Sequence, residues 1–117
     1  MTVIRMGEAL ERLDNDAEIY IELIGTYIKM CEADIAELVA KHSTGDSARV
    51  QFLAHKIKGA SMTVGADDLA KASAEVELAL KANPSADVAA AVARVKPVFA
   101  DTERELVKIR DTLQKQS

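Results

Sequence analysis

The sequence predicts an all-α protein, and three observations support that fold class. Hydrophobic residues make up 49% of the 117 residues but aromatic residues only 3%, so the core must be mainly aliphatic. Only 5 glycines and 2 prolines interrupt a chain rich in good helix formers. Apolar residues recur at spacings of three and four along several long stretches. The length fits one domain that covers residues 1–117.

The first expected helix is short and covers residues 2–12, with Thr2 as a candidate N-cap. The chain should then break at the polar run that begins with Asp14. Within this run, Asn15 and the acidic Glu18 three residues later form the pattern of a capping box. This pattern predicts that a second helix begins here.

The second helix should run from about residue 16 to residue 41, because its apolar positions form a wide stripe at helical spacing. The stripe comprises Ile19, Leu23, Ile24, Tyr27, Ile28, Met30, Cys31, Ile35, Leu38 and Val39. Cys31 is the single cysteine, and we expect a buried free thiol in a reducing compartment. The polar residues 41–46, with His42 among them, predict a loop.

The third helix is expected to begin at Asp46 or Ser47 and to end at Val64. Its apolar line consists of Val50, Leu53, Ile57, Ala60 and Val64. Gly65 follows directly, and glycine readily adopts the left-handed conformation that often ends a helix.

The fourth helix should span about residues 66–82, and Asn83 with Pro84 should cap and begin the last helix. Leu69, Ala72, Val76 and Leu80 should face inward from the fourth helix, and Val88, Val92, Val95, Phe99, Thr102, Leu106, Ile109 and Leu113 from the last. Pro97 predicts a kink or a short break. Four long amphipathic helices joined by short loops favour an antiparallel four-helix bundle with a short additional N-terminal helix.

The charge and the apolar pattern exclude several classes of protein. A net charge of -4 and a pI of about 5.2 argue against a nucleic-acid partner. No apolar run is long enough for membrane insertion, and the N-terminus lacks the pattern of a signal peptide. We therefore expect a cytoplasmic protein. The Met1 start and the short polar tail favour a free-standing protein, and nothing in the sequence requires a dimer, so we expect a monomer.

His55 is the residue that packing explains least. At about 100° per residue, it lies about 200° from Leu53 on the helical wheel, almost opposite the apolar line. The residues that share its face are Gln51, Lys58, Gly59 and Met62.

These neighbours suit a histidine that carries a phosphoryl group. A neutral imidazole is a nucleophile near neutral pH, and an ammonium such as that of Lys58 can stabilise phosphoryl oxygens. Gly59 costs the helix about 1 kcal/mol relative to alanine, which suggests that the site needs clearance. Alternatively, Gly59 could be a glycine that allows close helix packing. Met62 offers an exposed apolar contact for a partner.

The sequence around His55 resembles the histidine-containing phosphotransfer (HPt) domain family of multistep phosphorelays. The family pattern is a histidine, any residue, an apolar residue, lysine, glycine and a small residue, and residues 55–60 match it as His-Lys-Ile-Lys-Gly-Ala. Residues 64–66, Val-Gly-Ala, and Leu69 extend the match. A later apolar-glutamate pair, Val76-Glu77, also fits, although the family usually has leucine before the glutamate.

The resemblance implies that His55 is phosphorylated on Nε2, that Lys58 neutralises the phosphoryl charge, and that Gly59 keeps the imidazole accessible. From their shared helix face, we also expect Gln51, Gly59 and Met62 to contribute to docking of a partner. The partners would be receiver domains of response regulators or hybrid histidine kinases. The partner would supply an aspartate and its bound Mg²⁺, so the HPt domain itself would need no cofactor and no metal.

Other functions and roles remain open at this point. A docking or adaptor module for receiver domains could share the fold, although it would not need His55. The sequence lacks a glycine-rich nucleotide loop, so we expect a phosphoryl carrier and not an enzyme that uses ATP. His42 and His55 alone would make a weak metal site. We expect Asp67 and Asp68 to stabilise a helix N-terminus, and Lys56 to be solvated or to snorkel.

Overall fold

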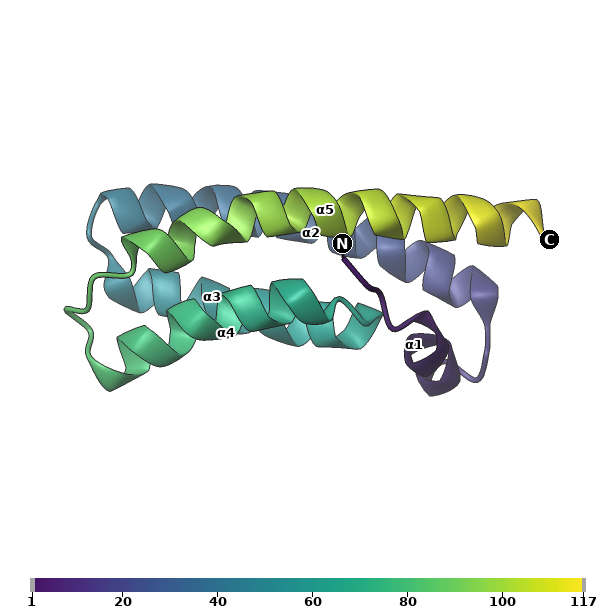
Figure 1. Cartoon of the computed structure of the whole chain (residues 1–117), viewed down its shortest axis with the longest axis horizontal. Helices are drawn as coiled ribbons and strands as arrows, with labels where there is room; N and C mark the ends of the chain where they lie inside the picture. The colour runs from purple at the N-terminus through teal and green to yellow at the C-terminus, as the bar shows by residue number, and fades with distance from the viewer. Residues whose placement is uncertain (1, 117) are drawn as a thin grey trace.

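The computed structural model describes residues 2–116 and contains five helices within them (Figure 1). The helices are α1 (Met6–Arg12), α2 (Ala17–Ser43), α3 (Ser47–Val64), α4 (Asp67–Ala82) and α5 (Ala89–Lys115). No strand occurs in the described part of the chain, which confirms the predicted all-α class.

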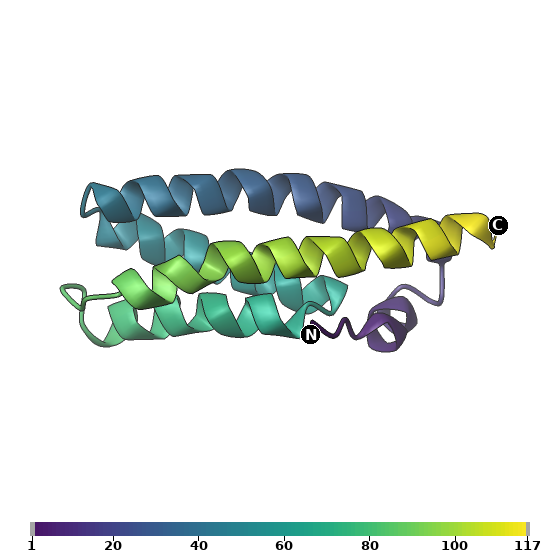
Figure 2. The same ribbon diagram turned by 45° about the horizontal axis from the view of Figure 1, so that its top comes forward.

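The four long helices form a helical bundle, and the described part of the molecule measures about 49 × 23 × 20 Å. α2 packs against α3 and α5, and α4 packs against the same two helices, so each long helix contacts two others (Figures 1 and 2). α1 lies at one end, near the C-terminal end of α5, and contacts α2 and α3 (Figure 2). None of the helices in residues 2–116 is both long and apolar enough to cross a bilayer.

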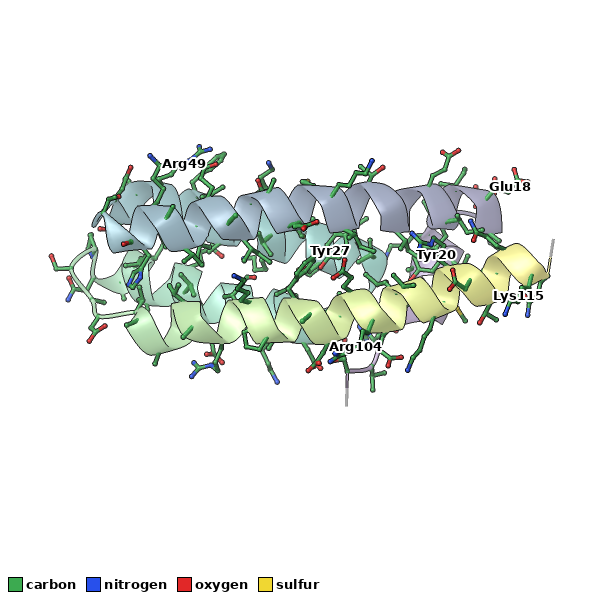
Figure 3. All side chains as sticks on the ribbon, turned by 90° about the horizontal axis from the view of Figure 1, so that it is seen from above. Glu18, Tyr20, Tyr27, Arg49, Arg104 and Lys115 are labelled. Atoms are coloured by element: carbon green, nitrogen blue, oxygen red, sulfur yellow. The ribbon has the colours of Figure 1, made fainter. Side chains whose placement is uncertain are left out.

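The predicted apolar stripe of α2 is confirmed in its middle, where Tyr27, Cys31 and Leu38 are among the buried residues, and differs near its ends. Ile19 is 47% exposed and Val39 is also exposed, whereas Tyr20 is completely buried. Tyr20 and Tyr27 both lie between the ribbons of α2 and α5 in Figure 3. The Tyr20 hydroxyl donates a hydrogen bond to the Val64 carbonyl at 2.9 Å, and the Tyr27 hydroxyl shares one with the Ser61 hydroxyl at 2.7 Å. Both partners lie on α3. A phenolic hydroxyl that is satisfied in this way lets an aromatic ring occupy the core. Cys31 is buried as predicted, and burial raises the pKa of its thiol to about 12.

The C-terminal end of α3 is fixed by Gly65 and by the segment before α1. Gly65 has a φ of 85°, which confirms the predicted left-handed stop. The Arg5 amide donates a hydrogen bond to the Gly65 carbonyl at 2.9 Å. A Cβ at Gly65 would lie 2.7 Å from the Arg5 carbonyl oxygen, so the close approach of the two backbones also requires glycine.

The predicted start of α1 was wrong, whereas α2 begins at Ala17, close to the predicted residue 16, but with a different cap. α1 begins at Met6 with Arg5 as its N-cap, so Thr2 does not cap it. Asp16 caps α2, and its side chain accepts a hydrogen bond from the backbone amide of Ile19. Asn15 adopts a left-handed φ of 59°, so it forms part of the turn and cannot serve as the first residue of a capping box.

The later connections also differ from the predictions. α2 continues to Ser43, so His42 lies in its last turn and not in a loop. Asn83 accepts a hydrogen bond from the Ser85 amide at 3.0 Å within a loop, whereas α5 begins only at Ala89. α5 continues through Pro97 without a break, because buried residues on both sides of the proline hold the helix against the core.

Candidate functional site

α3 presents His55 on the side away from the core, as the helical wheel predicts. Leu53 and Ile57 are completely buried, whereas the His55 side chain is 66% exposed. α3 is well defined at both ends, because Asp46 accepts a hydrogen bond from the Arg49 amide at its start and a left-handed glycine ends it. The imidazole is therefore carried by a regular helix whose opposite face is anchored in the bundle.

Glu77 on α4 contacts the two α3 side chains that the motif singles out. Its Oε2 lies 2.5 Å from His55 Nδ1, and its Oε1 lies 2.7 Å from Lys58 Nζ. The Glu77 side chain is only 3% exposed. One buried carboxylate thus links a histidine and a lysine that are separated by nearly one helical turn.

This contact determines the tautomer of His55. An ionised carboxylate can only accept hydrogen bonds, so the hydrogen of a neutral imidazole lies on Nδ1. Nε2 then keeps its lone pair, and no partner for it occurs among residues 2–116. The arrangement leaves a nucleophilic nitrogen on a largely exposed ring.

Glu77 stays ionised despite its burial. Burial tends to raise the pKa of its carboxyl group, but hydrogen bonds from Lys58 and His55, together with their positive charges, outweigh that effect. The pKa of Glu77 therefore lies below its ordinary value. The carboxylate can act as a permanent acceptor at neutral pH.

Lys58 contacts the same carboxylate as His55, so its ammonium is held on the side of α3 that carries the imidazole. Its side chain is 29% exposed and remains reachable from solvent. An ammonium has three hydrogen-bond donors, and the ion pair with Glu77 engages only part of that capacity. An anionic group bound to the imidazole could therefore recruit Lys58.

The remaining residues of this face are open to solvent to different degrees. Gly59 is exposed, and an added Cβ there would meet no atom within 4 Å, so packing within this chain does not require the glycine. Met62 is 55% exposed, whereas Gln51 is half-buried. Phe52, which the sequence reasoning missed, is also 55% exposed.

A second buried carboxylate lies on the other side of α3. Asp34 on α2 is 8% exposed, and the ammonium of Lys56 lies 3.1 Å from its Oδ2. Lys56 is thus not simply solvated but reaches across to a neighbouring helix. In the described residues no histidine contacts Asp34, in contrast to Glu77.

The other candidate residues do not form a site. Asp67 and Asp68 lie in the first turn of α4, where acidic groups interact favourably with the helix dipole, but neither makes a side-chain cap. Asp67 instead pairs with Arg5 at 2.9 Å. Within residues 2–116, no cluster of three or more histidine, cysteine or acidic side chains could hold a metal ion.

In the sequence, Glu77 belongs to the family pattern, but helical periodicity alone does not connect it with His55. A signal existed, because Glu77 follows the inward-facing Val76 and must lie at the flank of the α4 core stripe. A flanking acidic residue on one helix is well placed to meet basic residues on the next. Helical periodicity does not specify the neighbouring helix or the register.

Two comparisons found similar proteins, one by sequence and one by structure. A family model described as the Hpt domain matches residues 22–115. The crystal structure of histidine-containing phosphotransfer protein B (HptB) from Pseudomonas aeruginosa PAO1 is similar in fold, with a TM-score of 0.80 over 90% of this chain and 92% of that chain. The sequences are 24% identical, so this structural likeness concerns the fold alone. No curated protein matches the sequence.

Proposed function

Because the chain belongs to the Hpt domain family and is thus a phosphotransfer protein of a phosphorelay, we propose that His55 carries the phosphoryl group. In this proposal His55 accepts the group from a receiver-domain aspartate and passes it to a response regulator. The observation that carries the proposal is the 2.5 Å contact between His55 Nδ1 and the buried Glu77. This contact leaves Nε2 as the nucleophile on an exposed side chain.

The transfer step requires one bond to form and one to break. The Nε2 lone pair attacks the phosphorus of the aspartyl phosphate, and an N–P bond forms as the bond from phosphorus to the aspartate oxygen breaks. The aspartate leaves as a carboxylate, and the ring keeps its hydrogen on Nδ1. The phosphorylated ring then carries a positive charge next to the Glu77 carboxylate. The reverse sequence delivers the phosphoryl group to another receiver.

Glu77 and Lys58 have different roles in this proposal. Glu77 is a positioning residue, since it orients the imidazole and stabilises the positive charge that develops on the ring. Lys58 interacts with the phosphoryl oxygens, where its charge is worth most during transfer. A buried carboxylate with two partners can release its hold on Lys58 and still remain paired with the ring.

The partner completes the reaction site. We propose that the receiver brings its aspartate and its Mg²⁺, so the phosphoryl group comes from another protein and not from ATP. Docking would use the open face around His55, where Gly59 gives clearance and Met62 and Gln51 add contacts. We further infer that the four long helices form an antiparallel four-helix bundle, that residues 1–117 act as one domain, and that the protein works as a cytoplasmic monomer.

The test is a labelling experiment with a matched histidine control. The wild-type chain is incubated with receiver domains that carry a radioactive phosphoryl group on aspartate, and acid-labile, base-stable label on the chain is measured. The wild type and His42→Gln should both become labelled, whereas His55→Gln should not. Equal labelling of His55→Gln would contradict the proposal. Receiver binding without any labelling of the wild type would instead identify an adaptor module.

A further inference from the structure

Two large apolar side chains flank His55 on the solvent side of α3. Phe52 lies three residues before His55, Gly59 four residues after it, and Met62 three residues further, so the four positions alternate in steps of three and four. Phe52 and Met62 are each 55% exposed. Such a stripe normally packs against another helix or a partner surface.

Phe52 is held in place by Arg49 and Glu37, which do not contact His55. The guanidinium of Arg49 lies 5.0 Å from the centre of the Phe52 ring, which is a cation–π arrangement. Arg49 is in turn fixed by Glu37 on α2, with two hydrogen bonds of 2.6 and 3.1 Å. Figure 3 shows Arg49 on the outer side of the bundle beside α2. An exposed aromatic side chain that is already ordered loses less entropy when a partner covers it.

We propose that Phe52 is a specificity-determining anchor for the receiver domain, and that Arg49 and Glu37 position it. This inference rests on the proposed phosphotransfer at His55. The receiver must bring its aspartyl phosphate into bonding distance of Nε2. A residue three positions away is displaced by only about 4.5 Å along the helix axis. An interface of ordinary size covers about 800 Å² on each partner, so Phe52 falls within it.

The charges on α3 are compatible with this partner. Residues 47–64 contain Arg49, Lys56 and Lys58 but no acidic residue, and carboxylates of neighbouring helices pair with all three cations. The surface of α3 around His55 therefore contributes no acidic side chain that would repel an incoming aspartyl phosphate, and Lys58 lies beside His55 where it can interact with that group. The groove between α2 and α5, which includes Val39, lies on other helices and lacks this charge pattern.

The test compares transfer kinetics of substituted chains. A receiver domain that labels the wild type is charged with radioactive phosphate, and KM and kcat for transfer to each variant are measured. Phe52→Ala should raise KM about tenfold and change kcat less than about twofold, because a central aromatic anchor supplies binding energy. Phe52→Leu should recover part of the loss. Val39→Ala removes an exposed apolar side chain on another face and should behave like the wild type.

The positioning role of Arg49 has its own readout. Arg49→Ala should raise KM by a smaller factor, about threefold, because the ring of Phe52 remains but is less ordered. The double variant Phe52→Ala with Arg49→Ala should be no worse than Phe52→Ala alone, since Arg49 acts through the ring. Additive losses in KM would show that Arg49 contacts the partner directly and would overturn its assigned role.

A small phosphoryl donor separates this inference from the proposed function. Phosphoramidate needs no docking surface, so it should label His55 equally fast in the wild type and in Phe52→Ala. If neither phosphoramidate nor any receiver labels the wild type, the proposed function fails. If both label it but Phe52→Ala keeps the wild-type KM, only the anchor is overturned. Slower labelling of Phe52→Ala by phosphoramidate would show a structural role and would also overturn the anchor.

Discussion

α3 contacts a buried carboxylate of each neighbouring helix, Asp34 of α2 (the Asp34 seam) and Glu77 of α4 (the Glu77 seam). The two seams differ in one partner. Toward α2, Asp34 is 8% exposed and pairs with Lys56 at 3.1 Å. Toward α4, Glu77 is 2% exposed and pairs with Lys58 at 2.7 Å. Only Glu77 also holds a histidine ring nitrogen. A buried acid–lysine pair therefore serves to join helices in both places, and the additional nucleophilic partner distinguishes the candidate site.

Substitution of the two lysines should have the largest and most different effects on the transfer rate. Lys58→Ala should slow phosphoryl transfer by about a hundredfold, because it removes a charge that stabilises the transferred group. Lys56→Ala should leave the transfer rate within about twofold, since its ammonium is engaged by Asp34 on the other side of the helix. Rapid-quench transfer from a charged receiver measures both rates. Equal slowing of the two variants would mean that the seams are not functionally distinct.

Substitution of the two carboxylates should also affect the transfer rate differently, but by a smaller factor than substitution of the lysines. Glu77→Gln should slow transfer about tenfold, because a neutral amide can still contact the ring but no longer stabilises its positive charge. Asp34→Asn should transfer at the wild-type rate. The same rapid-quench assay applies, and circular dichroism should show unchanged helix content in both variants. A wild-type rate for Glu77→Gln would remove Glu77 from the reaction.

The two lysine variants should rank in the opposite order when the loss of folding stability is compared. Lys56→Ala leaves Asp34 buried without an ionic partner and should lower the free energy of unfolding by about 2 kcal/mol. Lys58→Ala should cost about 1 kcal/mol, because His55 still contacts Glu77. Urea denaturation followed by circular dichroism measures both values. A larger loss for Lys58→Ala would show that the Glu77 seam is mainly structural.

The smallest expected effect concerns acid. The folded state lowers the pKa of Glu77, so its ionised form stabilises the fold above the pH at which an unfolded glutamate titrates, about 4.3. That contribution is lost as the pH falls through this value toward the lowered pKa. The free energy of unfolding should therefore fall more in the wild type than in Glu77→Gln between neutral pH and about pH 3. Parallel loss in the two proteins would contradict the assigned ionisation of Glu77.

Local features of α3 could be predicted from the sequence because they depend on neighbouring residues. The outward position of His55 and the left-handed Gly65 both follow from helical periodicity and backbone preference. The N-cap of α2 was misplaced by one residue, since Asn15 and Asp16 are chemically similar and only the backbone geometry separates them. Asn83 was misassigned because a loop turn satisfies its side chain as well as a cap would.

Contacts between helices were beyond the reach of these local rules. Periodicity shows that Glu77 flanks a core stripe, but the register of α4 against α3 decides that it meets His55 and Lys58. Likewise, the choice of Tyr20 over Ile19 for the core depends on a carbonyl acceptor at the end of α3. The candidate site could thus be proposed from the sequence, whereas the contacts within it depend on the packing of the bundle.

The most direct test of this account is to identify the ring nitrogen that carries the phosphoryl group. The chain is labelled with ¹⁵N-histidine and phosphorylated by a charged receiver, and long-range ¹H–¹⁵N spectra with phosphorus coupling assign both nitrogens of His55. The contact with Glu77 predicts a phosphoryl group on Nε2 and a hydrogen on Nδ1. A phosphoryl group on Nδ1 would contradict the account, because that nitrogen could not then donate to Glu77.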